Sequence, residues 1–190
     1  MQIVNDDSVN FNWGNLIVFI YLAGITFCII KLVYQLLAIK KMFANMSNNA
    51  AFSFFRKKII AHNLPHHATV NLHEDIHVKQ LHSVDVLFFE IIGALNWFNP
   101  IAYAYKKTIK NIHEYLADEA AANFEGDKEA YALLLISQAF GVKPHQLTNH
   151  FYNKSLIKKR IYMLHKQRSK KTAILKYGMF VPLFALTLVL

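Results

Sequence analysis

The sequence has 190 residues, of which 54% are hydrophobic and 14% aromatic, and its mean hydropathy is +0.21. This apolar fraction exceeds the roughly 45–50% of soluble domains and argues against an ordinary soluble protein. The net charge is +9, and the single cysteine, Cys28, excludes an internal disulfide and a cysteine-based metal site.

Residues 16–39, LIVFIYLAGITFCIIKLVYQLLAI, form an apolar stretch of 24 residues with one charge, Lys31. As a helix this stretch is about 36 Å long, which is enough to cross a hydrocarbon core of about 30 Å. A signal peptide is the alternative, but Asp6 and Asp7 precede the stretch whereas no Lys or Arg does. We therefore predict a transmembrane helix.

The charges around this helix predict its orientation. Lys40, Lys41 and the basic residues 56–58 follow it, and positive charge stays on the cytoplasmic side. Residues 1–15 are then extracytoplasmic and residues 40–176 face the cytoplasm. A second apolar run, 177–190, is too short to cross at 14 residues, so we expect the start of a truncated transmembrane helix in a fragment of a longer protein. The basic clusters flank membrane segments without a nucleic-acid motif, which favours contact with the lipid bilayer and no nucleic acid.

The middle of the chain contains a shorter apolar stretch at residues 84–98, VDVLFFEIIGALNWF. Basic residues lie on both sides of it, so a single crossing would place one of these groups outside. A membrane-associated helix, which dips into the membrane, lies on it or packs against the spans, fits better. A full crossing paired with the stretch after Pro100 remains open.

Helix signals follow this stretch. Asn99 and Pro100 predict the start of a helix that runs to about Phe124 and stops near Gly126. Asp127 is expected to cap a further helix. The residues predicted to share one face of that helix are Ala130, Leu133, Leu134 and Ser137. Residues 51–55 and 68–72 are candidate short strands, so the predicted fold class is mainly α, with integral membrane helices and room for a short β-hairpin.

The stretch NLHEDIHVKQ, residues 71–80, contains the pattern His-Glu-x-x-His. Positions i and i+4 share a helix face, so His73 and His77 could bind one zinc ion. Glu74 would then lie beside the metal, where a carboxylate can take a proton from water. His82 comes five residues after His77, and we predict that it lies off this face, at the surface.

A third ligand is expected from NIHEYLADEAA, residues 111–121, on the helix that begins at Pro100. Glu114 and Asp118 are again four residues apart. One carboxylate could bind zinc while the other accepts the free N–H of a ligand histidine. His113 is the main alternative to Glu114 as a ligand. Small residues at Ala117, Ala121 and Ala122 would let this helix approach the first one closely.

The segments HEDIHVKQLHSVDVLFFE, NWFNP and HEYLADEAA, together with IKKR, resemble the BlaR/MecR-type membrane metallopeptidases, the signal-transducing gluzincins of the beta-lactam antibiotic response, most closely those of Bacteroidetes. The resemblance covers roughly residues 10–190. It implies a membrane-embedded zinc endopeptidase in which His73, His77 and Glu114 hold Zn²⁺, Glu74 is the general base and Asp118 holds a ligand histidine. Asp75 departs from the uncharged residues common at this position of zinc proteases and should point away from the metal.

The resemblance also implies a setting. The protein would lie in the cytoplasmic membrane, multi-pass at full length, with its active site facing the cytoplasm. Its substrate would be a cytoplasmic repressor or the protein itself, and a sensor or other domain would belong to the full-length chain. The alternative is a non-catalytic membrane signal transducer with structural zinc or none.

Overall fold

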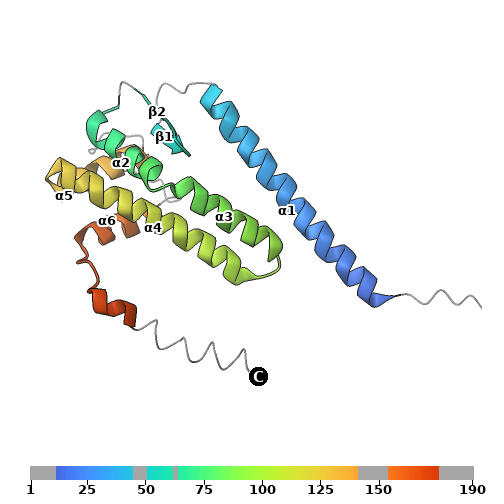
Figure 1. The fold of residues 1–190 in the computed structure, drawn as a ribbon. Coiled ribbons are helices and arrows are strands. Elements are labelled where there is room, and N and C mark those ends of the chain that lie inside the picture. Colours follow the sequence, from blue (N-terminus) through green and yellow to red (C-terminus); the bar gives the residue numbers. More distant parts are fainter. Residues whose placement is uncertain (1–11, 45–50, 62–63, 141–153, 176–190) are drawn as a thin grey trace, which may run out of the picture.

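The computed structural model describes residues 12–44, 51–61, 64–140 and 154–175 (Figure 1). Two strands form a hairpin, and the rest is mostly helical, which confirms the predicted fold class. The elements in chain order are α1 (Trp13–Ala44), β1 (Ala51–Phe54), β2 (Lys57–Ile60), α2 (His67–Lys79), α3 (His82–Leu95), α4 (Pro100–Glu125), α5 (Lys128–Phe140), α6 (Lys154–His165) and the 3-10 helix η1 (Lys171–Ile174).

Helix α4 is the centre of the arrangement. It packs against α2, α3, α5 and α6, and α3 lies side by side with its first half (Figure 1). Where α2 crosses α4, Ala117 and Ala121 are completely buried and Ala122 is nearly so, as the sequence predicted. Because these side chains are small, α2 and α4 can come close together near His73, His77 and Glu114.

Local signals set the ends of α4 and the start of α5. The Asn99 side chain accepts a hydrogen bond from the Ile101 N–H at 2.9 Å, and Pro100 opens the helix. Gly126 ends it with φ 80°, a left-handed conformation that costs glycine little. Asp127 then accepts bonds from the N–H groups of Glu129 and Ala130. These predicted boundaries are confirmed.

The predicted hairpin exists, but its second strand is not the predicted one. Strand β1 pairs antiparallel with β2, with Phe54 opposite Lys57, so the partner strand lies just two residues further on. Residues 68–72 instead belong to α2. Packing explains the difference, because Thr69 and Val70 are buried within the helix that crosses α4. The prediction of a strand at 68–72 was therefore wrong.

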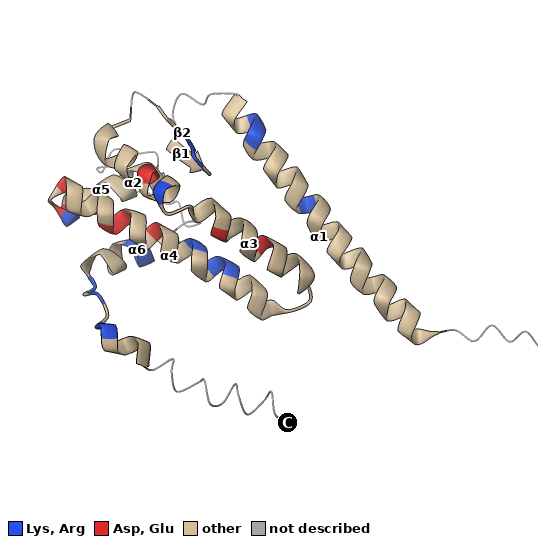
Figure 2. Cartoon of the chain, in the orientation of Figure 1, with Lys and Arg blue, Asp and Glu red and all other residues tan. Residues whose placement is uncertain are grey.

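Helix α1 stands beside the other elements and contacts α3 near the end of that helix (Figure 1). Its 32 residues include the predicted span 16–39, and by length and composition it can cross a membrane. Figure 2 shows it almost free of charged residues, whereas α4 carries acidic residues near α2 and basic residues beside α3. The predicted segment 177–190 and residues 1–11 lie outside the described residues.

The buried face of α5 differs from the predicted one. Leu134 is 5% exposed as expected, but Leu133 is 53% exposed, and Tyr131, Ala132 and Leu135 are buried instead. The Tyr131 hydroxyl donates a hydrogen bond to buried Asp118, which fixes the rotation of α5 about its axis. A polar contact that periodicity does not encode thus accompanies the exposure of Leu133.

We expect Leu134→Ala to lower the free energy of unfolding by about 2–4 kcal/mol, since it removes buried methyl groups and leaves a cavity. Leu133→Ala, next to it but exposed, should change stability by no more than about 0.5 kcal/mol. Chemical unfolding in detergent, followed by circular dichroism, measures both. Equal losses for the two variants would contradict the observed face of α5.

Candidate metal centre

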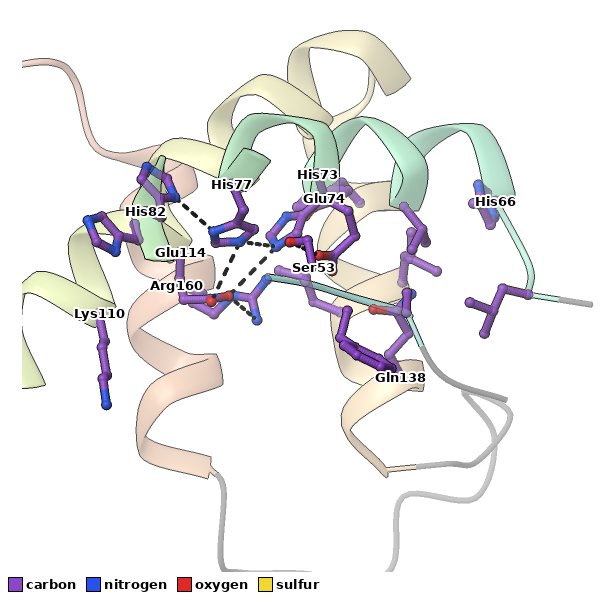
Figure 3. Close-up of a pocket in the computed structure, with 18 of the residues that line it drawn as sticks. Ser53, His66, His73, Glu74, His77, His82, Lys110, Glu114, Gln138 and Arg160 are labelled. Atoms are coloured by element: carbon purple, nitrogen blue, oxygen red, sulfur yellow. Dashed lines mark hydrogen bonds and ion pairs between the residues drawn. The ribbon is translucent and has the colours of Figure 1, made fainter. Parts of the chain in front are cut away.

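Helix α2 brings His73 and His77 onto one face. Their Nε2 atoms lie 3.2 Å apart, and both rings point towards Glu114 and Arg160 (Figure 3). The two side chains are largely buried, with 12% and 16% exposed. A single ion with zinc–nitrogen distances of about 2.0–2.1 Å can reach two nitrogens at this separation.

Helix α4 adds a carboxylate to this pair. The Glu114 oxygens lie 3.7 Å from the His73 Nε2 atom and 3.8 Å from the His77 Nε2 atom. The candidate donor atoms of all three residues lie within 4.8 Å of one another. Among the described residues, these three side chains are the group found close enough together to hold one metal ion. Two imidazoles and one carboxylate are a donor set that suits zinc, so the residues present fit the metal.

The alternative ligand, His113, lies elsewhere. It is buried, its ring stacks on His82 at 3.9 Å, and its Nε2 atom lies 3.1 Å from Asp85. It therefore belongs to the contact between α3 and α4. The geometry favours Glu114 as the third donor.

A buried carboxylate holds the far side of the His73 ring. The His73 Nδ1 atom lies 3.3 Å from Asp118 and 3.1 Å from the Tyr131 hydroxyl, which itself donates to Asp118 at 2.8 Å. Asp118 is 1% exposed. These contacts orient the ring so that its Nε2 atom faces the cluster, and the sequence pattern alone did not indicate Tyr131.

Arg160 of α6 links the two carboxylates. Its guanidinium donates to both Asp118 oxygens, at 2.7 and 2.5 Å, and lies 3.0 Å from Glu114. Burial by itself raises the pKa of Asp118, but the hydrogen bonds from Arg160 and His73 outweigh it, so the pKa falls below its usual value. Asp118 is thus ionised at neutral pH. Arg160 ends the IKKR segment quoted for the resemblance, but the sequence assigned it no role.

His82 holds His77, the second histidine of the candidate cluster. The His77 Nδ1 atom lies 2.8 Å from the His82 Nδ1 atom, and His82 is 4% exposed. The prediction of a surface histidine was wrong, because α2 ends at Lys79 and does not continue to position 82. Leu81 adopts a left-handed conformation with φ 54°, and α3 begins at His82. This change of chain direction places the His82 ring against the His77 ring.

The hydrogen bonds around His82 define one set of tautomers. If the His77 Nε2 atom presents its lone pair to the cluster, its Nδ1–H donates to the His82 Nδ1 atom. The His82 Nε2–H then donates to the Gln80 side-chain oxygen at 2.9 Å. Burial, followed by the nearby histidines, lowers the pKa of His77 to about 3, and burial and His113 lower that of His82 to about 4. Both rings are therefore neutral at pH 7.

Glu74 lies beside His73 (Figure 3) and is 9% exposed. Its carboxylate accepts a hydrogen bond from the Ser53 hydroxyl of β1 at 2.6 Å. The adjacent Asp75 points elsewhere and pairs with Lys58 of β2, as expected for a residue turned away from the metal. Sequence reasoning missed Ser53, because no motif joins the hairpin to the helix.

One open cleft of about 1290 Å³ lies between the hairpin, α2, α4 and α5. It is lined by the cluster residues His73, His77 and Glu114, and by Glu74 and Ser53. Its walls include Phe52 and Phe54 from β1 and Leu133 and Gln138 from α5. The cluster and Glu74 therefore lie in a space that can admit an extended peptide.

A His-Glu-x-x-His helix crossed by a helix that supplies a third, acidic donor is the arrangement of a zinc-dependent peptidase. The chain belongs to the BlaR1 peptidase M56 family, which it matches over residues 56–164, more than half of its length. The resemblance seen in the sequence is confirmed, and at family level the chain is a BlaR1-like membrane metallopeptidase. No curated protein and no solved structure matches it.

We expect His73→Ala, His77→Ala and Glu114→Ala each to reduce bound zinc from about one ion per chain to well below half, because each removes a donor atom. His66→Ala is the matched control, since His66 lines the same cleft but pairs with Glu125 at 2.9 Å. Elemental analysis of purified protein measures the ratio. Full occupancy in the three variants would rule out this cluster as the metal centre.

Removal of the His82 ring should weaken metal binding without removing a ligand. We expect His82→Ala to raise the zinc dissociation constant about 10–100-fold, since the His77 ring loses the bond that fixes its tautomer. His82→Asn keeps an acceptor and should recover part of the loss. Competition with a fluorescent chelator measures the constants, and equal affinity in His82→Ala and the unaltered chain would exclude this positioning role.

Proposed function

We propose that the protein is a zinc endopeptidase of the cytoplasmic membrane that cuts a peptide bond of a cytoplasmic regulator or of itself during transmembrane signalling. One observation carries the proposal: His73, His77 and Glu114 converge from two helices while Glu74 lies beside them in an open cleft. In this proposal the first three residues hold zinc and Glu74 is the general base.

The bound zinc supplies Lewis acidity, which polarises the scissile carbonyl and makes a water molecule more acidic. Glu74 takes a proton from the attacking water and then gives it to the leaving amine, so a single carboxylate serves as base and acid in turn. The Ser53 hydroxyl donates to the Glu74 carboxylate and restrains it. Because a carboxylate accepts several hydrogen bonds, water can approach Glu74 while this bond persists.

Asp118, Tyr131 and Arg160 act through the ligands in this proposal. Asp118 and Tyr131 hold the His73 ring, and Arg160 restrains Glu114 at 3.0 Å. The positive guanidinium also offsets the charge of the two acidic residues, so that the site is not overwhelmingly negative before the metal binds.

The substrate would bind in the cleft as an extended strand. Residues 68–72, a candidate strand by sequence, are helical and offer no strand edge to a peptide. Among the described residues β1 pairs only with β2, and β1 places Ser53 against Glu74. A peptide added beside β1 would carry its backbone past the general base.

The membrane placement follows the charges. With α1 crossing from outside to inside, residues 40–176 and the site lie on the cytoplasmic side, because Lys40 and Lys41 follow the span. The family's membrane location and the one apolar helix found among the described residues support this part of the proposal.

We expect Glu74→Gln to lower the cleavage rate by about 10²–10⁴-fold while zinc remains bound, since the amide cannot take a proton. Asp75→Asn is the matched control, because it removes the adjacent charge, which faces Lys58 and not the site. Cleavage of casein and of the chain itself, read as new chain ends by mass spectrometry, measures activity in vesicles. Unchanged cleavage by Glu74→Gln would refute the mechanism. Absence of cleavage in the unaltered, zinc-loaded chain would favour a non-catalytic transducer.

A further inference from the structure

The turn between α3 and α4 is docked on α1. The Tyr21 hydroxyl donates to the Leu95 carbonyl at 3.1 Å, and the Trp97 indole N–H donates to the Tyr21 carbonyl at 3.3 Å. Trp97 also fills a notch at Gly24, where an added Cβ would lie 2.2 Å from the indole ring. The end of the α3–α4 hairpin therefore lies at the level of residues 21–24 of the apolar helix.

The end of this hairpin is apolar and exposed. Residues 91–105, IIGALNWFNPIAYAY, contain no charged residue, and Figure 2 shows the turn between α3 and α4 without charge. Phe98 is 63% exposed and Ile101 is 60% exposed. Large side chains that are also exposed here are Ile91, Leu95, Tyr103 and Tyr105. We call residues 91–105 the hairpin tip.

The polar side chains of the turn bond to protein groups. The Asn96 amide donates to the Ile92 carbonyl, Asn99 accepts from Ile101, and the Tyr103 hydroxyl donates to the Trp97 carbonyl at 2.7 Å. With the two bonds to α1, each polar side chain of the turn has a protein partner. Irregular backbone is tolerated at membrane depth only when its polar groups are satisfied in this way. A turn that faced water would have no such requirement.

Charged residues reappear at the base of the tip, where one glutamate pairs with two lysines. Glu90 of α3 lies 2.5 Å from Lys106 and 3.1 Å from Lys110 of α4. The neighbouring Lys107 is exposed, and its long stem can carry the ammonium group towards headgroups. The base of the tip therefore has the composition of a membrane interface, and the tip has that of its interior.

The depth of the tip follows from α1. Tyr21 and Gly24 come 8 and 11 residues after Trp13, the first residue of the helix, which is about 12–17 Å along its axis. With Trp13 at the outer interface, this depth is near the middle of a core of about 30 Å.

We propose that the hairpin tip is a re-entrant element that enters the bilayer from the cytoplasmic side beside α1 and contacts lipid hydrocarbon. The proposal rests on the membrane crossing of α1 in the proposed function. Lipid is the occupant because the exposed apolar surface of the tip lies beside that of α1, and because the polar side chains of the turn bond to protein groups.

This placement restricts the substrate. Glu114 comes 15 residues after Asn99, which is about 22 Å along α4 from the tip. With the tip at mid-bilayer, the cluster lies at about the level of the cytoplasmic headgroups. A peptide bond can therefore reach the cluster only at the membrane surface, where a segment of a cytoplasmic regulator or of this chain would have to bind.

Fluorescence quenching in vesicles tests the depth. The chain has two tryptophans, Trp13 and Trp97, so Trp13→Phe and Trp97→Phe each leave one indole. The 190-residue chain carrying Glu74→Gln is placed in phosphatidylcholine vesicles brominated near the headgroup or deep in the acyl chains. We expect deep bromines to quench Trp97 most and shallow bromines to quench Trp13 most. Because the enzyme is inactive, the result is independent of peptide hydrolysis.

The outcomes separate the possibilities. If aqueous iodide quenches Trp97, the tip lies in water and the proposal is overturned. If neither iodide nor brominated lipid quenches Trp97, protein covers the tip and the proposal is also overturned. If brominated lipids also fail to quench Trp13, α1 does not cross the bilayer and the membrane part of the proposed function fails with it. Phe98→Trp, made in a chain in which Trp13 and Trp97 are both replaced by Phe, repeats the test at a position that is 63% exposed.

A charge placed on the tip provides a matched comparison. Phe98→Lys should reduce deep quenching of Trp97 at least about twofold, since a charge near the bilayer centre is strongly disfavoured. Phe124→Lys, which alters a 59% exposed phenylalanine at the other end of α4, should leave the quenching unchanged. Equal effects of the two changes would show that Phe98 does not face hydrocarbon.

Discussion

The close crossing of α2 over α4 is the contact on which the site depends. Ala117 and Ala121 are completely buried there, so the helices approach with little side chain between them. A longer residue at either buried position would have to displace its neighbours, which include the elements that carry the donors. The alanines are therefore as necessary to the donor cluster as the donors, although they carry no chemistry themselves.

Burial of the Asp118 carboxylate under this crossing requires compensation. Asp118 is 1% exposed and Glu114 is about one-third exposed at its side chain, and Arg160 contacts both. Removal of one partner from such a buried pair typically costs about 3–5 kcal/mol, because the other charge is left unpaired. Helix α6 therefore contributes to the site through the ion pairs of Arg160 with Asp118 and Glu114. The hydroxyl of Tyr131 ties α5 to the same carboxylate.

The features that the sequence predicted well are those that local chemistry determines. Asn99, Pro100 and Gly126 set the ends of α4 through their own backbone preferences, and the spacing of Glu114 and Asp118 placed both on one face. The errors arose where distant contacts decide. Residues 68–72 became helical because Thr69 and Val70 pack near α4, and Leu133 faces outward because Tyr131 binds Asp118. His82 was misplaced because neither a glycine nor a proline marks the end of α2; the left-handed turn is at Leu81.

Helix α4 carries both the second part of the hairpin tip and Glu114, the proposed third ligand. A rigid helix cannot change the distance between its ends, so the depth of the tip in the bilayer determines the height of the donor cluster above it. The other two donors follow, since α2 is bound to α4 by the alanine crossing and to α3 through the contact between His77 and His82. In the proposed membrane placement, Trp97 in its notch at Gly24 links α1 to the turn that precedes α4.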